Sequence, residues 1–188
     1  MSTASVSPIQ TQRTARMPAA QSSSDPFELR APRSTDGALI HDLVRRCKPL
    51  DENSLYCNLI QATHFRETSV AAEAPDGDLL GFISGYIVPD RTDTLFIWQV
   101  AVSKDARGMG LGKKMLKDIL ERNADVQYLH TTVTPENEAS WGMFRSLARD
   151  LDAPLHSTVM FDSEAHFDGR HDDEILIQIG PFEVGQDV

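Results

Sequence analysis

The chain has 188 residues, 40% of them hydrophobic, and a formal net charge of −10 at pH 7. This length holds one domain with a full hydrophobic core, and no window approaches the roughly 20 consecutive apolar residues that a membrane-spanning helix needs. The acidic balance argues against nucleic-acid binding, because phosphate contacts require a basic surface, and it favours an amine-bearing substrate, although a purely solvating role explains it equally well.

Residues 1–25 are rich in Ser, Thr, Ala and Gln and have almost no large apolar side chains. Such a segment buries too little surface to offset the entropy of ordering it, so we predict a disordered tail. A single domain is predicted over residues 26–184, followed by a short tail over residues 185–188.

The domain is predicted to begin with a strand over residues 27–30 and two helices. Pro32 and a polar cap at Ser34 or Thr35 open the first helix, and the carboxylate of Asp51 is expected to cap the second. The apolar positions read from the helical period are Leu39, Ile40, Leu43, Val44 and Cys47 in the first helix and Leu55, Tyr56, Leu59 and Ile60 in the second.

A β-hairpin is predicted from two apolar runs, residues 69–74 and 79–88, that flank Pro75-Asp76-Gly77-Asp78. Asp-Gly between two such runs is a strong turn signal. Residues 94–102 are apolar on both faces, which is typical of a strand in the middle of a covered sheet. We therefore expect this strand to form the centre of the sheet.

A strand–helix–strand unit follows, in which a glycine-rich turn leads from the central strand into a helix and then to a strand over residues 128–134. A helix over residues 137–149, a strand over 156–161, an acidic loop ending at Glu174 and a strand over 175–179 complete the domain. The inward positions of the first of these helices are predicted to be Leu111, Met115, Leu116, Ile119 and Leu120. This order of elements predicts an α/β domain with a mixed sheet.

The two cysteines, Cys47 and Cys57, lie in apolar stretches and have no CxxC partner. They are predicted to be reduced thiols of a cytoplasmic protein, rather than a disulfide or zinc ligands. No metal site is predicted.

The glycine turn Arg107-Gly108-Met109-Gly110-Leu111-Gly112-Lys113 is the most specific motif of the chain. It lacks the GxGxxG spacing of dinucleotide-binding folds, and it lacks the four residues between glycines of a Walker loop. Small residues at the start of a helix let backbone amides approach an anion, and the helix dipole favours negative charge there. A pyrophosphate site is therefore predicted, the alternative being a tight turn without a ligand.

This turn, after a buried strand, resembles motif A of the GNAT family of N-acetyltransferases, Arg/Gln-x-x-Gly-x-Gly/Ala. Asn137, Ser140 and Phe144 resemble the family's second motif, Asn-x-x-Ala/Ser-x-x-x-Tyr, although Phe144 lacks the hydroxyl with which many members protonate the leaving thiolate. The resemblance implies acetyl-CoA as cosubstrate and a mixed, mostly antiparallel sheet of six or seven strands flanked by about four helices. The cofactor-binding residues that it implies are Val100, Val102, Arg107, Gly108, Gly110, Gly112, Lys113, Asn137 and Phe144.

Four further blocks, residues 47–54, 95–102, 131–141 and 171–182, resemble the members of this family that acetylate the 4-amino group of L-2,4-diaminobutyrate in ectoine biosynthesis. This resemblance implies a small diamino acid as substrate and a homodimer. Two alternatives stay open: an acetyltransferase for another polyamine or an aminoglycoside, and a non-catalytic module that only binds acyl-CoA.

An alkylammonium with a pKa near ~10 must lose a proton before it attacks a thioester, so the site needs carboxylates and a proton acceptor. The central strand has no glutamate over residues 96–99, so these groups must come from elsewhere. The resemblance implies Tyr56, His171 and Glu174 as catalytic residues. It implies as substrate-binding residues Asp51, Tyr56, Trp98, Asn137, His171 and Glu174.

Each of these residues also has an ordinary structural interpretation. Asp51 would be only a helix cap, and Tyr56 and Trp98 would be core aromatics. His171 and Glu174 would belong to a solvated acidic loop. His130, on the strand beside the cofactor, is expected to be structural, with a role as an alternative base left open.

Overall fold

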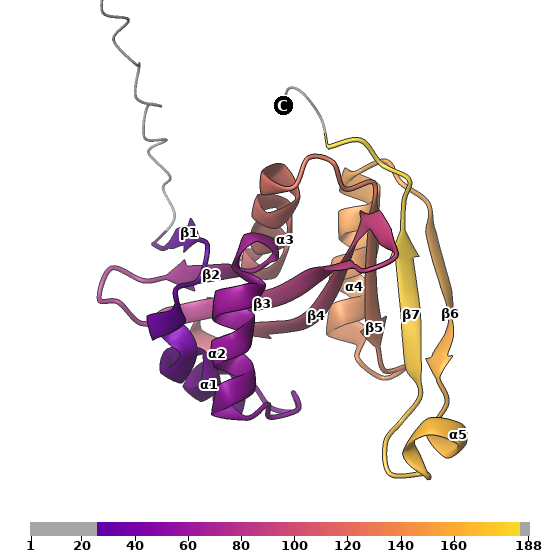
Figure 1. Cartoon of the computed structure of the whole chain (residues 1–188), viewed down its shortest axis with the longest axis horizontal. Coiled ribbons are helices and arrows are strands. Elements are labelled where there is room, and N and C mark those ends of the chain that lie inside the picture. The colour runs from indigo at the N-terminus through magenta and orange to yellow at the C-terminus, as the bar shows by residue number, and fades with distance from the viewer. Residues whose placement is uncertain (1–25, 185–188) are drawn as a thin grey trace, which may run out of the picture.

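The computed structural model describes residues 26–184 and contains one seven-stranded sheet in the order β1-β2-β3-β4-β5-β7-β6 (Figure 1). Its strands are β1 (Glu28–Arg30), β2 (Val70–Glu73), β3 (Leu79–Val88), β4 (Arg91–Val102), β5 (Tyr128–Val133), β6 (Leu155–Phe161) and β7 (Glu174–Ile179). β4 and β5 are parallel, and the other neighbouring pairs are antiparallel. The predicted fold class is confirmed. The tails predicted over residues 1–25 and 185–188 lie outside the described residues.

Helices cover both faces of the sheet (Figure 1). They are α1 (Gly37–Arg46), α2 (Leu55–His64), α3 (Leu111–Arg122), α4 (Glu138–Asp150) and the short α5 (Ser163–Phe167). One hydrophobic cluster joins α1 to the sheet residue Phe82, and the other joins α3 and α4 to the adjacent Ile83. Neighbouring residues of a strand point to opposite faces, so the two helix layers sandwich the sheet. No helix of the described part of the chain is long and apolar enough to cross a membrane.

The helical period identified the buried positions of α3 and most of those of α1, but not those of α2, whose buried residues are Asn58, Gln61 and Ala62. All five inward residues predicted for α3 are at most 1% exposed. In α1 the predictions for Ile40, Leu43, Val44 and Cys47 are confirmed, but Leu39 is 40% exposed. It lies at the margin of the apolar stripe, about 100° from Ile40 around the helix axis.

The predicted helix caps are wrong in both N-terminal helices. Ser54, and not Asp51, caps α2, because its side chain accepts a hydrogen bond from Cys57 N at 3.1 Å. A 3-10 turn, η1 (Ser34–Asp36), precedes α1, and the carboxylate of Asp36 accepts a hydrogen bond from Arg33 N at 2.7 Å. Asp51 therefore lies in a loop before the helix, where its carboxylate has no capping role.

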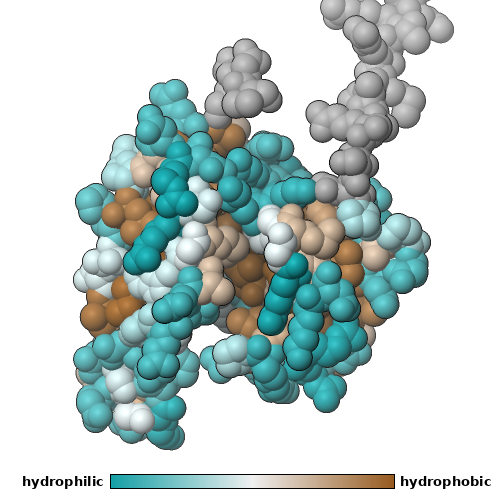
Figure 2. Space-filling view, turned by 180° about the vertical axis from the view of Figure 1, so that it is seen from behind, coloured by the Kyte–Doolittle hydropathy of each residue, from teal (hydrophilic) through white to brown (hydrophobic). Residues whose placement is uncertain are grey.

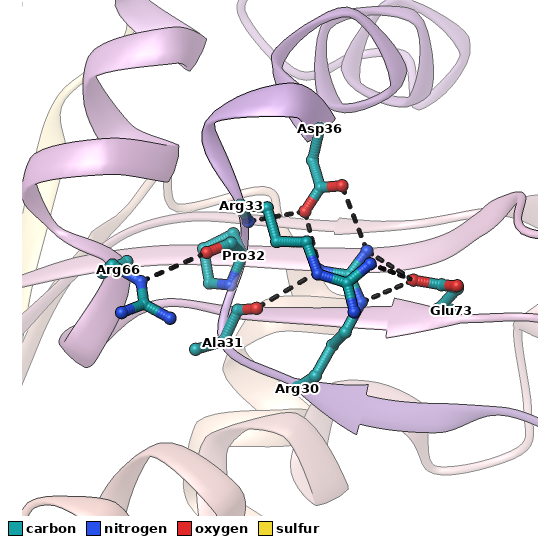
Figure 3. Close-up of polar contacts among 7 residues, drawn as sticks. All are labelled: Arg30, Ala31, Pro32, Arg33, Asp36, Arg66 and Glu73. Carbon is teal, nitrogen blue, oxygen red and sulfur yellow. Dashed lines mark hydrogen bonds and ion pairs between the residues drawn. The ribbon is translucent and has the colours of Figure 1, made fainter.

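A buried ion-pair network joins the first strand to this turn (Figure 3). The Arg30 guanidinium donates to both oxygens of Asp36, at 2.7 and 3.1 Å, and also bonds Glu73 on β2. Burial alone would raise the pKa of Asp36, but the hydrogen bonds from Arg30 and from Arg33 N outweigh it and lower that pKa. The network therefore fixes the entry of α1 onto the sheet.

The acidic stretch after β6 is not a plain loop, because it contains α5. Asp162 caps this helix by accepting hydrogen bonds from Glu164 N and Ala165 N at 3.0 and 2.9 Å. Aspartate before a short helix is a standard cap, so a local signal for this helix was present in the sequence. The helix closes the β6–β7 hairpin at one end of the molecule (Figure 1).

Candidate active site

The parallel strands β4 and β5 pair over only part of their length. Residues 94–97 pair with residues 128–131, whereas residues 98–102 continue along β3 alone. Figure 1 shows β4 turning away from β5. On the edge of β4 opposite β3, the backbone amides and carbonyls of residues 98–102 have no strand partner among the described residues. An extended amide chain could therefore form hydrogen bonds there as an added strand. Val100 and Val102, predicted to bind the cofactor through their backbone, lie on this segment.

A β-bulge changes the direction of the side chains at the same place. In the β3–β4 register Ser84 is opposite Gln99 and Gly85 is opposite Ile97, so Trp98 is the extra residue. Trp98 is 46% exposed and is therefore not a core aromatic. Because of the bulge, Gln99 points to the α1 and α2 side, and Val100 packs against the cluster of α3 and α4.

The glycine turn has the geometry expected of an anion site. Gly108 and Gly110 have φ angles of +80° and +71°, and a Cβ added to either would meet no atom within 4 Å. Glycine is thus required by the backbone conformation, while the surface of the turn stays open. Gly110 is the N-cap of α3 and provides no side-chain cap, so the first amides of α3 face outward at the positive end of the helix dipole. The exposed Arg107 precedes them.

Two residues predicted for the pyrophosphate site also make contacts between α3 and α4. Lys113 Nζ lies 3.1 Å from Ser146 Oγ and 3.1 Å from Asp150 Oδ2, both on α4. A Cβ on Gly112 would lie 2.7 Å from Met143 Sδ, so this glycine permits close packing of α3 on α4. The side chain of Lys113 is therefore bound to α4 and not directed to the glycine turn. Arg107 supplies the positive charge beside this turn.

The second motif also has a structural role. The Asn137 side chain caps α4 by accepting a hydrogen bond from Ser140 N at 3.1 Å. Phe144 is 2% exposed and lies in the core cluster of α3 and α4. We therefore assign Phe144 to packing and not to the cofactor, because a side chain enclosed in this way presents no surface to a ligand.

Three of the predicted substrate residues meet at one place. His171 Nε2 lies 3.8 Å from Asp51 Oδ2 and 4.0 Å from Glu174 Oε1. Asp51 comes from the loop between α1 and α2, and the other two come from the end of the β6–β7 connection. We call these three residues the acidic–histidine cluster. Its two carboxylates can hold an ammonium group, and its imidazole can accept a proton.

The short helix α5 supports His171. Ser163 Oγ donates to His171 O at 2.7 Å, and the Phe167 ring lies 4.8 Å from the imidazole centroid. His171 Nδ1 donates to Asp172 O at 2.8 Å, and this bond is the main cause that raises the pKa of His171. The nearby carboxylates of Glu174, Asp51 and Asp172 raise it further.

Two further residues considered in the sequence analysis, Tyr56 and His130, differ in their exposure to solvent. Tyr56 is 72% exposed, so it is not the core residue of the ordinary interpretation. His130 is buried on β5 beside Gln178, whose Nε2 lies 3.3 Å from its Nε2. Burial is the main cause that lowers the pKa of His130, which keeps this imidazole neutral.

Sequence reasoning missed the role of Gln99. This residue is 8% exposed, and its amide bonds the main chain of Asp51 and the side chain of Asn53, each at 3.0 Å. A polar residue within the apolar run of residues 95–102 was the available signal.

Figure 2 shows the face covered by α3 and α4, which is hollowed near its middle, with apolar residues at the bottom of the recess.

Comparisons with known proteins agree with this geometry. The Acetyltransferase (GNAT) family matches residues 38–148. The L-2,4-diaminobutyric acid acetyltransferase of Methylotuvimicrobium alcaliphilum is 51% identical over 160 residues, 84% of this chain and 92% of that protein. The protein of the same name from Bordetella parapertussis is 49% identical over 158 residues, 83% of this chain and 85% of that protein.

A solved structure shares both fold and sequence. The diaminobutyrate acetyltransferase EctA from Paenibacillus lautus, in complex with its substrate L-2,4-diaminobutyric acid and coenzyme A, has a TM-score of 0.78 and 36% identity. The match covers 86% of this chain and 98% of that chain. The predicted resemblance is confirmed over most of the described residues, and the chain belongs to the GNAT family of acetyltransferases.

Proposed function

We propose that this chain transfers the acetyl group of acetyl-CoA to the 4-amino group of L-2,4-diaminobutyrate, giving N4-acetyl-L-2,4-diaminobutyrate. The relatives that match most of the chain are named for this substrate. The observation that carries the proposal is the acidic–histidine cluster, because two carboxylates and an imidazole within 4.0 Å suit a cationic diamino acid.

Acetyl-CoA supplies the activated acetyl group as a thioester, and the described residues fit this cosubstrate. The open glycine turn, the first amides of α3 and the Arg107 guanidinium suit its pyrophosphate. The edge of residues 98–102 that faces away from β3 suits its amide-bearing arm. Asn137 keeps a role at the start of α4, as the cap that fixes this helix beside the turn.

In the proposed reaction Asp51 and Glu174 hold the ammonium groups of the substrate. His171 in its neutral form accepts a proton from the 4-ammonium, which leaves a neutral amine to attack the thioester carbonyl. Tyr56, with an exposed hydroxyl, is proposed to relay a proton to the departing thiolate, since Phe144 has no proton to give. Trp98 provides an amphipathic wall beside the carbon chain of the substrate.

We further propose that the protein acts as a homodimer in the cytoplasm, in a step of ectoine biosynthesis. β6 is an edge strand that exposes Val159, Met160 and Phe161 by 50%, 40% and 37%. Edge strands with apolar side chains favour association with another chain. Figure 2 shows apolar surface at the margin where β6 lies. The free thiols of Cys47 and Cys57 agree with a reducing compartment.

A specificity panel tests the proposed substrate against another polyamine or an aminoglycoside. The release of free CoA would be measured with L-2,4-diaminobutyrate, L-ornithine, spermidine and an aminoglycoside. We expect the highest kcat/KM for diaminobutyrate, and a value for ornithine about 10- to 200-fold lower, because one extra methylene has this effect in a fitted site. A higher kcat/KM for spermidine or the aminoglycoside would contradict the proposal, and no release with any amine would favour the binding module.

A further inference from the structure

Gln99 joins the centre of the sheet to the loop that carries Asp51. Its Nε2 donates to Asp51 O at 3.0 Å, and its Oε1 accepts from Asn53 Nδ2 at 3.0 Å. The residue is 8% exposed on a strand whose neighbours are mostly apolar. Both ends of a buried amide are thus satisfied by one short segment, residues 51–53, which is a specific and demanding arrangement.

The bulge at Trp98 makes this contact available. Side chains alternate along a strand, and Ile97 packs on the α3 side. Without the extra residue, Gln99 would point to that same side, away from the loop between α1 and α2. The shifted register between Ser84 and Gly85 turns Gln99 toward the loop. The bulge therefore has two effects: it exposes Trp98, and it directs the Gln99 side chain toward the loop between α1 and α2.

The Asp51 carboxylate has little else to hold it. Its side chain is 87% exposed and touches the cluster only through the 3.8 Å approach to His171 Nε2. An ion pair at this exposure does not hold a loop in one position. The nearby pair of Lys48 and Glu52 is exposed as well. The fixed point of this segment is its main-chain bond to a buried side chain of the sheet.

We propose that Gln99 is a positioning residue, which anchors the main chain of Asp51 so that the Asp51 carboxylate stays beside His171 and receives the cationic substrate. Asn53 completes the anchor by holding the Gln99 amide in the orientation that donates to Asp51 O. This inference rests on the proposed function and deepens it, because it names the group that sets the substrate site without touching the substrate.

Kinetics of Gln99→Met test the anchor, with Gln61→Met as the matched control. Gln61 is a fully buried glutamine on α2, and its side-chain oxygen accepts a hydrogen bond from Asn58 Nδ2. For Gln99→Met we expect the KM for diaminobutyrate to rise roughly tenfold, with the KM for acetyl-CoA within about twofold of the wild-type value. Gln61→Met should leave both constants close to those of the wild type. Equal constants for Gln99→Met and the wild type would overturn the anchor.

A double-mutant cycle separates positioning from general damage. If Gln99 acts through Asp51, then Gln99→Met combined with Asp51→Asn should have the same KM for diaminobutyrate as Asp51→Asn alone. Multiplied effects of the two changes would overturn the inference. Should Gln99→Met fold poorly, Asn53→Ala provides a milder break of the same anchor, with a smaller rise in the same constant.

NMR titration of His171 tests the anchor without any substrate. His171 faces the carboxylates of Asp51, Glu174 and Asp172, and all three raise its pKa. Release of Asp51 should therefore lower the pKa of His171 in Gln99→Met and in Asp51→Asn, but not in Gln61→Met. An unchanged pKa in Gln99→Met would overturn the anchor even if the wild type acetylates diaminobutyrate. If Gln99→Met lowered the pKa of His171 but the wild type did not acetylate diaminobutyrate, only the proposed function would be rejected.

Discussion

Glu174 begins β7, and its Oε1 lies 4.0 Å from Nε2 of His171. The side chain of Glu174 is 20% exposed and that of His171 is 33% exposed, so the pair is only partly screened by water. The negative charge of Glu174 raises the pKa of His171, after the larger effect of the hydrogen bond to Asp172 O. In the proposed reaction this carboxylate receives the substrate, and its charge also raises the pKa of the imidazole.

The first prediction concerns the pH dependence of Glu174→Gln. The neutral form of His171 is the proposed base, so kcat/KM for diaminobutyrate should rise as pH increases through the pKa of His171. Removal of the Glu174 charge lowers this pKa, so the rising limb should move to lower pH. The pH profile of kcat/KM measures this shift. A limb that stays in place, or moves to higher pH, would remove His171 from the role of base.

The same variant should also bind the substrate less well. We expect a rise of about 10- to 100-fold in the KM for diaminobutyrate, because a charged contact is lost, with an unchanged KM for acetyl-CoA. Steady-state kinetics with each substrate varied in turn would check this. Glu164→Gln, a change at an exposed residue on α5, serves as control. Equal KM values for Glu174→Gln and the control would exclude Glu174 from the substrate site.

Arg107→Ala should give the opposite pattern. The Arg107 guanidinium is the side-chain cation assigned to the pyrophosphate, so its loss should raise the KM for acetyl-CoA by about 10- to 100-fold. The KM for diaminobutyrate should stay the same. Lys113→Ala, which removes a cation engaged with Asp150, should have a much smaller effect on acetyl-CoA. An effect of Arg107→Ala confined to diaminobutyrate would contradict the assignment.

Gly110 allows a test of the turn through its backbone. Its φ of +71° costs an alanine roughly 1 to 2 kcal/mol, whereas asparagine adopts this region more readily. Gly110→Ala should lower the free energy of unfolding by about that amount and raise the KM for acetyl-CoA, and Gly110→Asn should do less of both. Gly77, at φ +89° in the β2–β3 turn, is the matched control. Gly77→Ala should lose similar stability and keep its KM for acetyl-CoA.

Asp36→Asn should destabilise the fold without affecting the site. Arg30 keeps Glu73 as a partner but loses its charged hydrogen bonds to Asp36, so the free energy of unfolding at pH 7 should fall by about 2 kcal/mol. The pKa of Asp36 is lowered by folding, so its contribution is present at neutral pH and is lost as pH falls through the folded-state value, below the ordinary 3.8. Urea unfolding at pH 7 and pH 3 measures both effects.

Glu67→Gln provides the control for this stability test. Glu67 pairs with Arg66 at the surface, with side chains 74% and 52% exposed, so its loss should change the free energy of unfolding by at most about 0.5 kcal/mol. If the difference between Asp36→Asn and the wild type did not shrink at pH 3, the network would not be the source of the stability.

The fold was largely predictable because periodic patterns are local. The five inward residues of α3 follow the helical period, and the Asp-Gly turn between β2 and β3 has its own conformational signal. The caps of α1 and α2 were not predictable in the same way. Ser54 and Asp51 are both good caps in isolation, and the sequence does not show that Asp51 O contacts Gln99 in the loop before the helix.

The site was predictable only in part, since its geometry depends on contacts between distant segments. The family resemblance brought Asp51, His171 and Glu174 forward, and they do lie together. The roles of Lys113 and Gly112 are set by Ser146 and Met143 on α4, which no local pattern reveals. A β-bulge likewise leaves no reliable trace in an apolar strand, so the direction of Gln99 could not be read from alternation.

The central claim, acetylation of the 4-amino group, is tested most directly on the product. The purified protein would be incubated with acetyl-CoA and L-2,4-diaminobutyrate, and the product examined by mass spectrometry and two-dimensional NMR. We predict one added acetyl group, with the amide proton coupled to the C4 methylene. Acetylation at the 2-amino group, or no acetylated product while acetyl-CoA still binds, would contradict the account.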